Sequence, residues 1–224
     1  MSDLAVRELH TARYIRQSDA QSPSFVLPLP MTWWSRPFEY AWCSRFVKKS
    51  DTVLDAACGV SHPFKFWLAL HAAEVHACDR DPLIESDEAV RAEVRRDLGE
   101  DAEQLLAEET LVAVKRRQAD LQELPYPTAM FDRVFCISVL EHLEPGTRRR
   151  AIAELARVTR TTGQMVMTFD VPDVEPRDLP DILGEAGLHV DGDIDFVRPS
   201  DAIGSAMWGR PLHCFRVVAR KNGS

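Results

Sequence analysis

The sequence lacks any long apolar run. No stretch approaches the ~20 consecutive apolar residues that a helix needs to cross a bilayer, and the charged N-terminus has no apolar signal-peptide core. The five cysteines, at positions 43, 58, 78, 136 and 214, are odd in number and include no CxxC pair. Free thiols in a reducing compartment explain them better than disulfides or a zinc site. We therefore expect a cytoplasmic protein with no membrane contact and no metal ion.

Positive charge is also scarce, with 27 basic against 35 acidic side chains and a net charge of -8 at pH 7. Because a phosphate backbone is bound by clustered positive charge, this balance argues against nucleic acid as a partner. The sequence has no internal repeat and no low-complexity tract. Its 224 residues, 45% of them apolar, are enough for one domain with a large core.

What is present is a regular alternation of strand and helix patterns from residue 51 onward. Short apolar runs predict strands over 52–57, 74–78, 111–118, 131–139, 164–169, 188–197 and 213–220. Helical patterns fill the segments between them, over 63–73, 82–109, 148–160 and 179–186. This alternation predicts an α/β fold with a mostly parallel sheet and helices on both faces. The connection 198–212, with its prolines and glycines, favours an antiparallel pairing of the last two strands.

Residues 1–50 precede this pattern and show mixed signals, with a short helix expected over 6–17 and extended chain over 22–30. Five aromatic residues then fall within ten positions: Trp33, Trp34, Phe38, Tyr40 and Trp42. They either pack against the main core or line a pocket for an organic ligand, since aromatic rings supply flat, rigid contacts. We divide the chain into a helical and aromatic lid segment (1–50) and a main domain (51–224).

The turns after the first strands carry the residues of chemical interest. Ligands of open α/β sheets bind at the carboxyl ends of the strands. The sequence places VLDAACGVS there (53–61), with a glycine that lets a ligand approach the backbone closely. Asp79 ends the next strand, 20 residues after Gly59, and Asp120 follows the third. A carboxylate at this spacing suits the two hydroxyls of a ribose.

Together and in order, these segments resemble the class I S-adenosylmethionine-dependent methyltransferases. The resemblance rests on VLDAACG, on Asp79, on ADLQELPYPTAMFDRVFCISVLEHL (119–143) and on AIAELARVTRTTGQMVMTFD (151–170), and it covers about residues 50–221. It implies a Rossmann-like, seven-stranded sheet with an antiparallel last strand, transferase activity, and S-adenosyl-L-methionine as the cofactor. The residues that would bind this cofactor, by the same resemblance, are Asp55, Ala57, Gly59, Ser61, Asp79, Asp120, Leu121, Ile137 and Ser138.

Within that set the resemblance implies distinct positions. Asp79 would bind the ribose, and Asp120 and the Leu121 backbone would face the adenine. Asp55 and Gly59 would form the loop under the methionine part, and Ile137 and Ser138 would lie near the methionine end. The loop departs from the family's usual D-x-G-x-G-x-G, because Ala57 and Ser61 stand in the outer glycine places. Either the loop still accommodates the cofactor, with the Ser61 hydroxyl as a donor, or affinity has been lost.

His142, at the carboxyl end of the fourth strand, is the best-placed candidate for a general base. The pKa of a histidine, ordinarily about 6.5, suits proton removal near neutral pH. The alternative is a histidine that orients its loop or caps the next helix. We assign the neighbouring Glu141 a structural role.

These features predict S-adenosylmethionine-dependent methyl transfer to a small organic acceptor. The acceptor pocket is expected to form from the aromatic segment 33–42, the turn 141–145 and the loop 198–212 with Met207 and Trp208. The alternative function is a cofactor-binding partner or regulatory subunit that keeps the fold without the reaction. A nicotinamide-dependent oxidoreductase is disfavoured by the absent G-x-G-x-x-G. The sequence is compatible with a homodimer.

Overall fold

The computed structural model describes residues 3–207 and 209–223, and in these residues nine strands form one mixed β-sheet. The long strands are β4 (Thr52–Ala56), β5 (Glu74–Asp79), β6 (Val114–Gln118), β7 (Phe131–Ile137), β8 (Thr159–Val171) and β11 (Leu212–Lys221). Three short strands pair with β11: β1 (Arg13–Tyr14), β9 (Leu188–Val190) and β10 (Gly204–Ser205). A separate hairpin joins β2 (Ser24–Phe25) and β3 (Leu27–Pro28).

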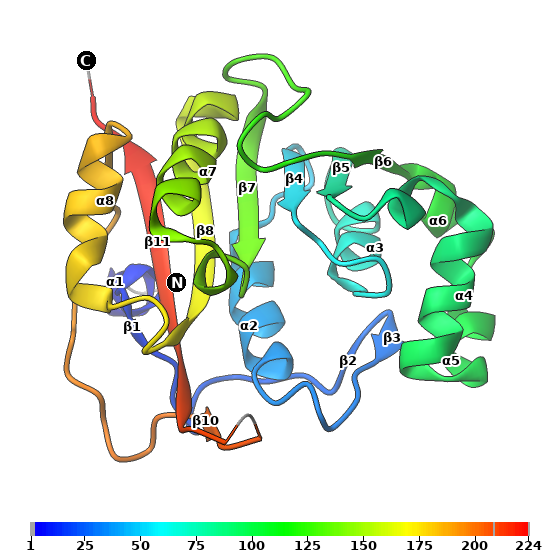
Figure 1. Ribbon diagram of the computed structural model, residues 1–224, viewed down its shortest axis with the longest axis horizontal. Helices are drawn as coiled ribbons and strands as arrows, with labels where there is room; N and C mark the ends of the chain where they lie inside the picture. Colours follow the sequence, from blue (N-terminus) through cyan, green and yellow to red (C-terminus); the bar gives the residue numbers. More distant parts are fainter. Residues whose placement is uncertain (1–2, 208, 224) are drawn as a thin grey trace.

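The order of the main path is β1-β11-β8-β7-β4-β5-β6, and Figure 1 shows these strands side by side from β11 to β6. Strands β4 to β8 run parallel to one another, whereas β11 is antiparallel to β8. The α/β, Rossmann-like fold with an antiparallel last strand is therefore confirmed. The strand order reverses between β4 and β7, so their carboxyl ends form the switch point where open α/β sheets bind ligands.

Some expected boundaries were wrong. The count of seven strands is too low, because the two-residue strands β1 and β10 also pair with β11. Residues 13 and 14, expected to be helical, form β1, and residues 111–113 end a helix instead of starting the third strand. The sixth strand stops at residue 190, before Gly192, which turns the chain with a φ of 139° close to the backbone of His10.

Helices cover both faces of the sheet. The α-helices are α1 (Asp3–His10), α2 (Arg36–Cys43), α3 (Phe64–Ala69), α4 (Asp87–Leu98), α5 (Glu100–Leu105), α6 (Glu108–Ala113), α7 (Pro145–Val158) and α8 (Leu179–Glu185). Short 3-10 helices occupy Ser44–Phe46, Pro82–Glu85, Leu140–His142 and Pro176–Asp178. Gly99, at a φ of 98°, ends α4 and begins α5, which divides the helical segment expected over 82–109.

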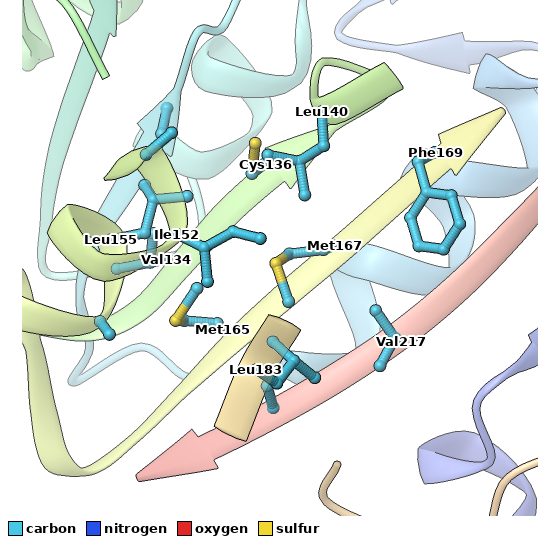
Figure 2. Packing of buried hydrophobic residues seen from close by; sticks show 14 of the residues in the cluster. Val134, Cys136, Leu140, Ile152, Leu155, Met165, Met167, Phe169, Leu183 and Val217 are labelled. Atoms are coloured by element: carbon cyan, nitrogen blue, oxygen red, sulfur yellow. The ribbon is translucent and has the colours of Figure 1, made fainter. Parts of the chain in front are cut away.

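Side chains of the central strands alternate between the two faces, which builds one apolar cluster on each. On one face, Ile152 and Leu155 of α7 and Leu183 of α8 pack against β7, β8 and β11, as Figure 2 shows. On the other face, Tyr40 of α2 and Phe64 of α3 belong to a second cluster that includes buried side chains of the same strands. The sheet is therefore close-packed on both sides, which holds its strand ends in fixed positions.

The N-terminal segment joins this framework. Strand β1 pairs with β11, and Nε1 of Trp42 donates to the carbonyl oxygen of Leu9 at 3.0 Å. Tyr40 and Trp42 are buried in the core, and Phe38 packs against a separate small apolar cluster that includes Ile15. Among the described residues, no helix is long and apolar enough to span a membrane.

Candidate functional site

The loop after β4 is held in an unusual conformation at the switch point. Ala57 and Gly59 take left-handed φ angles of 52° and 64°; that region is open to glycine and costs other residues about 1–2 kcal/mol. Beneath the loop, the buried Lys65 donates from Nζ to the carbonyl oxygens of Gly59 and His62, each at 2.6 Å. These bonds hold the loop conformation from inside the protein.

Asp79 anchors the same loop from the end of β5. Its Oδ2 accepts a hydrogen bond from the Gly59 backbone N–H at 2.8 Å, and its Oδ1 accepts one from the Asp81 N–H at 3.0 Å. A carboxylate oxygen can accept more than one hydrogen bond, so both oxygens retain acceptor capacity. The side chain is partly exposed and faces a cavity.

His62 lies directly over the glycine. A Cβ atom built on Gly59 would lie 2.6 Å from Cδ2 of His62, so only glycine fits under this ring. The ring stacks on Trp33 at 4.1 Å, and its Nδ1 shares a 2.7 Å hydrogen bond with the Tyr40 hydroxyl. Burial, with Arg36 nearby, keeps the pKa of His62 well below its ordinary value, so the ring is neutral.

A cavity of about 520 Å³, called the first cavity, opens at this switch point, and pockets of roughly 300–1,000 Å³ suit small ligands. Six of the residues predicted to bind the cofactor line it: Asp55, Ala57, Gly59, Asp79, Ile137 and Ser138. It also takes in Arg36, Tyr40, His62, Arg80 and His142. Residues from the ends of β4, β5 and β7 thus face one space.

Asp120 lies outside the first cavity. It lines a separate cavity of about 470 Å³, called the third cavity, with Gln118 and Glu123. Arg80 borders both this cavity and the first. The Asp120 carboxylate accepts a 2.8 Å hydrogen bond from the Gln122 backbone N–H. Leu121 lies in the apolar core and faces neither cavity.

Ser61 is also turned away from the first cavity. It is buried, and its hydroxyl donates to Oδ2 of Asp97 on helix α4 at 2.6 Å. The Ser61 hydroxyl, which the sequence suggested as a donor to the cofactor, instead donates within the protein and connects the loop to α4.

Burial dominates the electrostatics under the loop. It raises the pKa of the Asp55 carboxyl to about 7, although the neighbouring Lys65 acts in the opposite direction. Burial likewise lowers the pKa of Lys65 from its ordinary value. The two groups are close enough to influence each other, so the protonation of Asp55 changes the charge that supports the loop.

A buried ion pair from helix α2 borders the first cavity. Arg36 Nη1 lies 2.5 Å from Oε2 of Glu39, whose side chain is fully buried. The other oxygen of Glu39 accepts hydrogen bonds from the hydroxyls of Ser138, at 2.6 Å, and Thr168, at 2.5 Å. Burial opposes the charge, but Arg36 and these hydroxyls hold the pKa of Glu39 below its ordinary value.

A second cavity, of about 430 Å³, adjoins the first. Four residues line both cavities: Arg36, His62, Ser138 and His142. All three segments expected to form an acceptor pocket contribute to its lining, with Trp33 and Trp34, Glu141, and Arg210 and Leu212. Thr32, Asp170 and Asp173 also line it and lie outside those segments. Met207 is exposed and does not line it, and Trp208 lies outside the described residues.

The second cavity contains two carboxyl groups that hydrogen bonds do not satisfy. Glu141 is 8% exposed, and neither of its carboxyl oxygens has a partner in another described residue. Oδ1 of Asp170, next to the last residue of β8, is also buried and has no hydrogen-bond partner among the described residues. Burial raises the pKa of Glu141 to about 8 and that of Asp170 to about 7.

His142 is exposed at the boundary of the two cavities, and its backbone N–H donates to the carbonyl oxygen of Val139 at 3.0 Å. Arg36, Glu39 and Asp170 were not predicted from the sequence, and Glu141 was expected to have a structural role. Asp170 directly follows the strand expected over 164–169, which was a usable signal. Nothing in the local pattern around Arg36 or Glu39 marks them, because their role depends on contacts with distant strands.

Comparisons with known proteins agree with this architecture. A family model described as a methyltransferase domain matches residues 54–167, about half of the chain. Among curated proteins there is no significant match. The solved 4+2 cyclase SpnF aligns with a TM-score of 0.60 and 15% identity over 98% of this chain and 92% of its own.

Two further solved structures are methyltransferases. A TehB-like S-adenosylmethionine-dependent methyltransferase from Corynebacterium glutamicum aligns with a TM-score of 0.56 and 15% identity, over 82% of this chain and 87% of its own. Magnesium protoporphyrin IX methyltransferase from Synechocystis, with bound S-adenosylmethionine, aligns with a TM-score of 0.53 and 21% identity, over 81% of this chain and 76% of its own. At such identities these likenesses show the fold alone.

The fold and the cavity at its switch point define an α/β protein of the class that binds a nucleoside-containing ligand at the carboxyl ends of its strands. With the match over residues 54–167, the chain belongs to the methyltransferase domain family, whose cofactor is S-adenosylmethionine. It is thus an enzyme of the methyltransferase class.

Proposed function

We propose that this protein transfers the methyl group of S-adenosylmethionine to a small organic acceptor bound in the second cavity. The observation that carries the proposal is the shared boundary of the two cavities, formed by Arg36, His62, Ser138 and His142. A cofactor in the first cavity and an acceptor in the second would meet at this boundary. The net charge of -8 and the aromatic lining favour a small molecule over a nucleic acid.

For the cofactor, we propose that Asp79 holds the ribose hydroxyls with the acceptor capacity that its loop contacts leave free. Asp55, Ala57, Gly59, Ile137 and Ser138 would surround the methionine part, because all five line the first cavity. The residues fit such a group, because the first cavity offers it the Asp79 carboxylate, which keeps free acceptor capacity at the end of β5.

The adenine would lie toward the third cavity, beside Asp120, since Arg80 connects that cavity with the first. Leu121 would then support the adenine site from the core. Ser61 would act through its bond to Asp97, by holding the loop against α4, instead of touching the cofactor.

The bound cofactor supplies an activated methyl group, so the protein's task is to align the acceptor with it and exclude water. Positioning of this kind can contribute ~7–11 kcal/mol toward the barrier. We propose that residues 1–50 act as the lid, because Trp33 and Trp34 line the second cavity. The Arg36–Glu39 pair would fix the wall between the cavities, with Glu39 orienting the Ser138 hydroxyl.

His142 is our proposed general base. It lines both cavities, and its exposure lets it exchange a proton with solvent. A role in orienting the turn is the alternative, and the pH dependence of a His142→Asn variant separates the two. Cytoplasmic location and a homodimer stay predictions.

Titration calorimetry with S-adenosylhomocysteine tests the cofactor site. Asp79→Ala is expected to weaken binding by about 1.5–3 kcal/mol, the range for hydrogen bonds to a charged group. Asp101→Ala, which removes an exposed carboxylate from helix α5, is the control and should change nothing. Unchanged affinity in Asp79→Ala would show that the ribose lies elsewhere. No binding to the wild-type protein would refute both the proposed methyl transfer and the cofactor-binding, non-catalytic alternative.

A further inference from the structure

The ion pairs of the second cavity leave two carboxyl groups uncompensated. Arg36 is paired with Glu39, and Arg210 is paired with Asp173. These pairs neutralise both arginines of the lining. Glu141 and Asp170 line the same cavity, and the described residues provide no ion pair to either.

Such an arrangement costs stability unless a ligand completes it. A buried polar group without a partner loses the hydrogen bonds that water gives it in the unfolded chain, and the loss is larger when the group is charged. Glu141 carries this cost on both carboxyl oxygens while it is 8% exposed, and Asp170 carries it on one. A structural role for Glu141 would show as a hydrogen bond to another part of the chain, and among the described residues its carboxyl group interacts with no backbone N–H but its own.

The aromatic side of the cavity has matching chemistry. Trp33 and Trp34 are partly buried and line the same space as the two carboxyl groups. The faces of indole rings attract cations, and tryptophan does so more strongly than the other aromatic residues. Carboxylates and indole rings together select a positively charged group with an apolar body.

We propose that the second cavity binds the methyl acceptor as a protonated amine, with Glu141 and Asp170 as its anionic partners. This inference rests on the proposed methyl transfer and names its substrate class. Trp33 and Trp34 would contact the apolar part of the amine. The nitrogen would lie beside Glu141, close to the boundary that Ser138 and His142 form with the first cavity.

For an amine acceptor the first proton goes to the Glu141 carboxyl group, so the general-base role that we gave His142 becomes the relay of that proton to solvent. The bound ammonium gives one proton to the Glu141 carboxylate, which leaves a lone pair on nitrogen. That lone pair attacks the sulfonium methyl carbon, the C–S bond breaks, and its electron pair stays on sulfur. The products are an N-methylammonium ion and the thioether, and His142 passes the proton from Glu141 to solvent. The raised pKa of Glu141, about 8, suits a proton acceptor for this step.

The test compares phenethylamine with 2-phenylethanol, its neutral counterpart, by titration calorimetry in the presence of S-adenosylhomocysteine. Tryptamine and tryptophol serve as a second, larger pair. We expect the amine of at least one pair to bind about tenfold or more tightly than its alcohol, because only the amine supplies a cation. Tryptophan fluorescence is a second readout that does not need the reaction.

The variants locate the effect. Glu141→Gln and Asp170→Asn should each remove most of the preference for the amine and leave alcohol binding unchanged. Glu144→Gln alters an exposed carboxyl group in the same turn and should keep the preference. Thermal unfolding checks that each variant is folded.

Three results would overturn the inference: no amine preference in the wild-type protein, tighter binding of 3-phenylpropionate than of phenethylamine, or a preference that persists in both acidic-residue variants. Affinity for S-adenosylhomocysteine is measured in the same series. If that nucleoside binds while the amines do not, only the acceptor class is wrong. If it does not bind to the wild-type protein, the proposed function itself fails.

Discussion

The Arg36–Glu39 pair offers the sharpest test of how the wall between the cavities is held. Glu39 is fully buried, lies 2.5 Å from Arg36, and accepts hydrogen bonds from Ser138 and Thr168 on its other oxygen. Glu39→Gln keeps the shape but leaves the Arg36 charge without its counter-ion. Removing one partner of a buried pair costs about 3–5 kcal/mol. We expect the free energy of unfolding to fall by that amount.

Urea unfolding, followed by circular dichroism and tryptophan fluorescence, measures this loss. Replacing the second partner as well, in Glu39→Gln/Arg36→Met, removes the uncompensated charge and should recover much of the stability. Glu185→Gln is the matched control, because Glu185 forms an exposed pair with Arg149 whose loss should cost less than about 1 kcal/mol. If Glu39→Gln costs no more than this control, the buried pair does not hold the wall.

Two further predictions concern the loop after β4. Gly59→Ala should lower stability by about 1–2 kcal/mol and weaken S-adenosylhomocysteine binding by an order of magnitude or more, because the added Cβ displaces His62. Gly187→Ala is the control: Gly187 has a φ of 71° with open space around it, so this variant should lose stability but keep its affinity for S-adenosylhomocysteine. If both glycine variants bind S-adenosylhomocysteine with the same affinity, the reasoning is contradicted. The pKa of Asp55 lies at about 7 in the folded state, above its ordinary 3.8, so its stabilising contribution is present at low pH and is lost as the pH rises toward 7. Asp55→Asn should match the wild-type protein near pH 4 and exceed its unfolding free energy at pH 8 by more than about 1 kcal/mol, and a pH-independent difference would count against the shift.

The fold was largely predictable because its signals are local. The apolar runs that form β4, β7 and β8 predicted these strands clearly, because both faces of a parallel sheet are buried and its strands are apolar throughout. The same alternation placed Asp55 and Asp79 at strand ends. Boundaries failed where tertiary contacts decided them: β1 exists because β11 offers it an edge, and Gly192 ends a strand because the backbone of His10 lies against it.

The site was predictable only in part. Asp79 and Gly59 could be placed because parallel strands bring their carboxyl ends to one edge, and the structure joins them by a 2.8 Å hydrogen bond. Ser61 could not, since its hydroxyl bonds to Asp97, 36 positions away. Glu141 was interpreted as structural because the sequence gives the residue type but does not show whether its carboxyl group has hydrogen-bond partners in the fold.

The amino-acid order alone thus determined the strand and helix periods, the glycine turn and the family, because these depend on neighbours a few residues apart. The tertiary structure decided which charges are paired. Glu39 has a cation and two hydroxyls within hydrogen-bond distance, whereas Glu141, buried beside the second cavity, has neither among the described residues. The difference arises because burial and hydrogen bonding of a charged group are set by segments far apart in the chain, which only folding brings together.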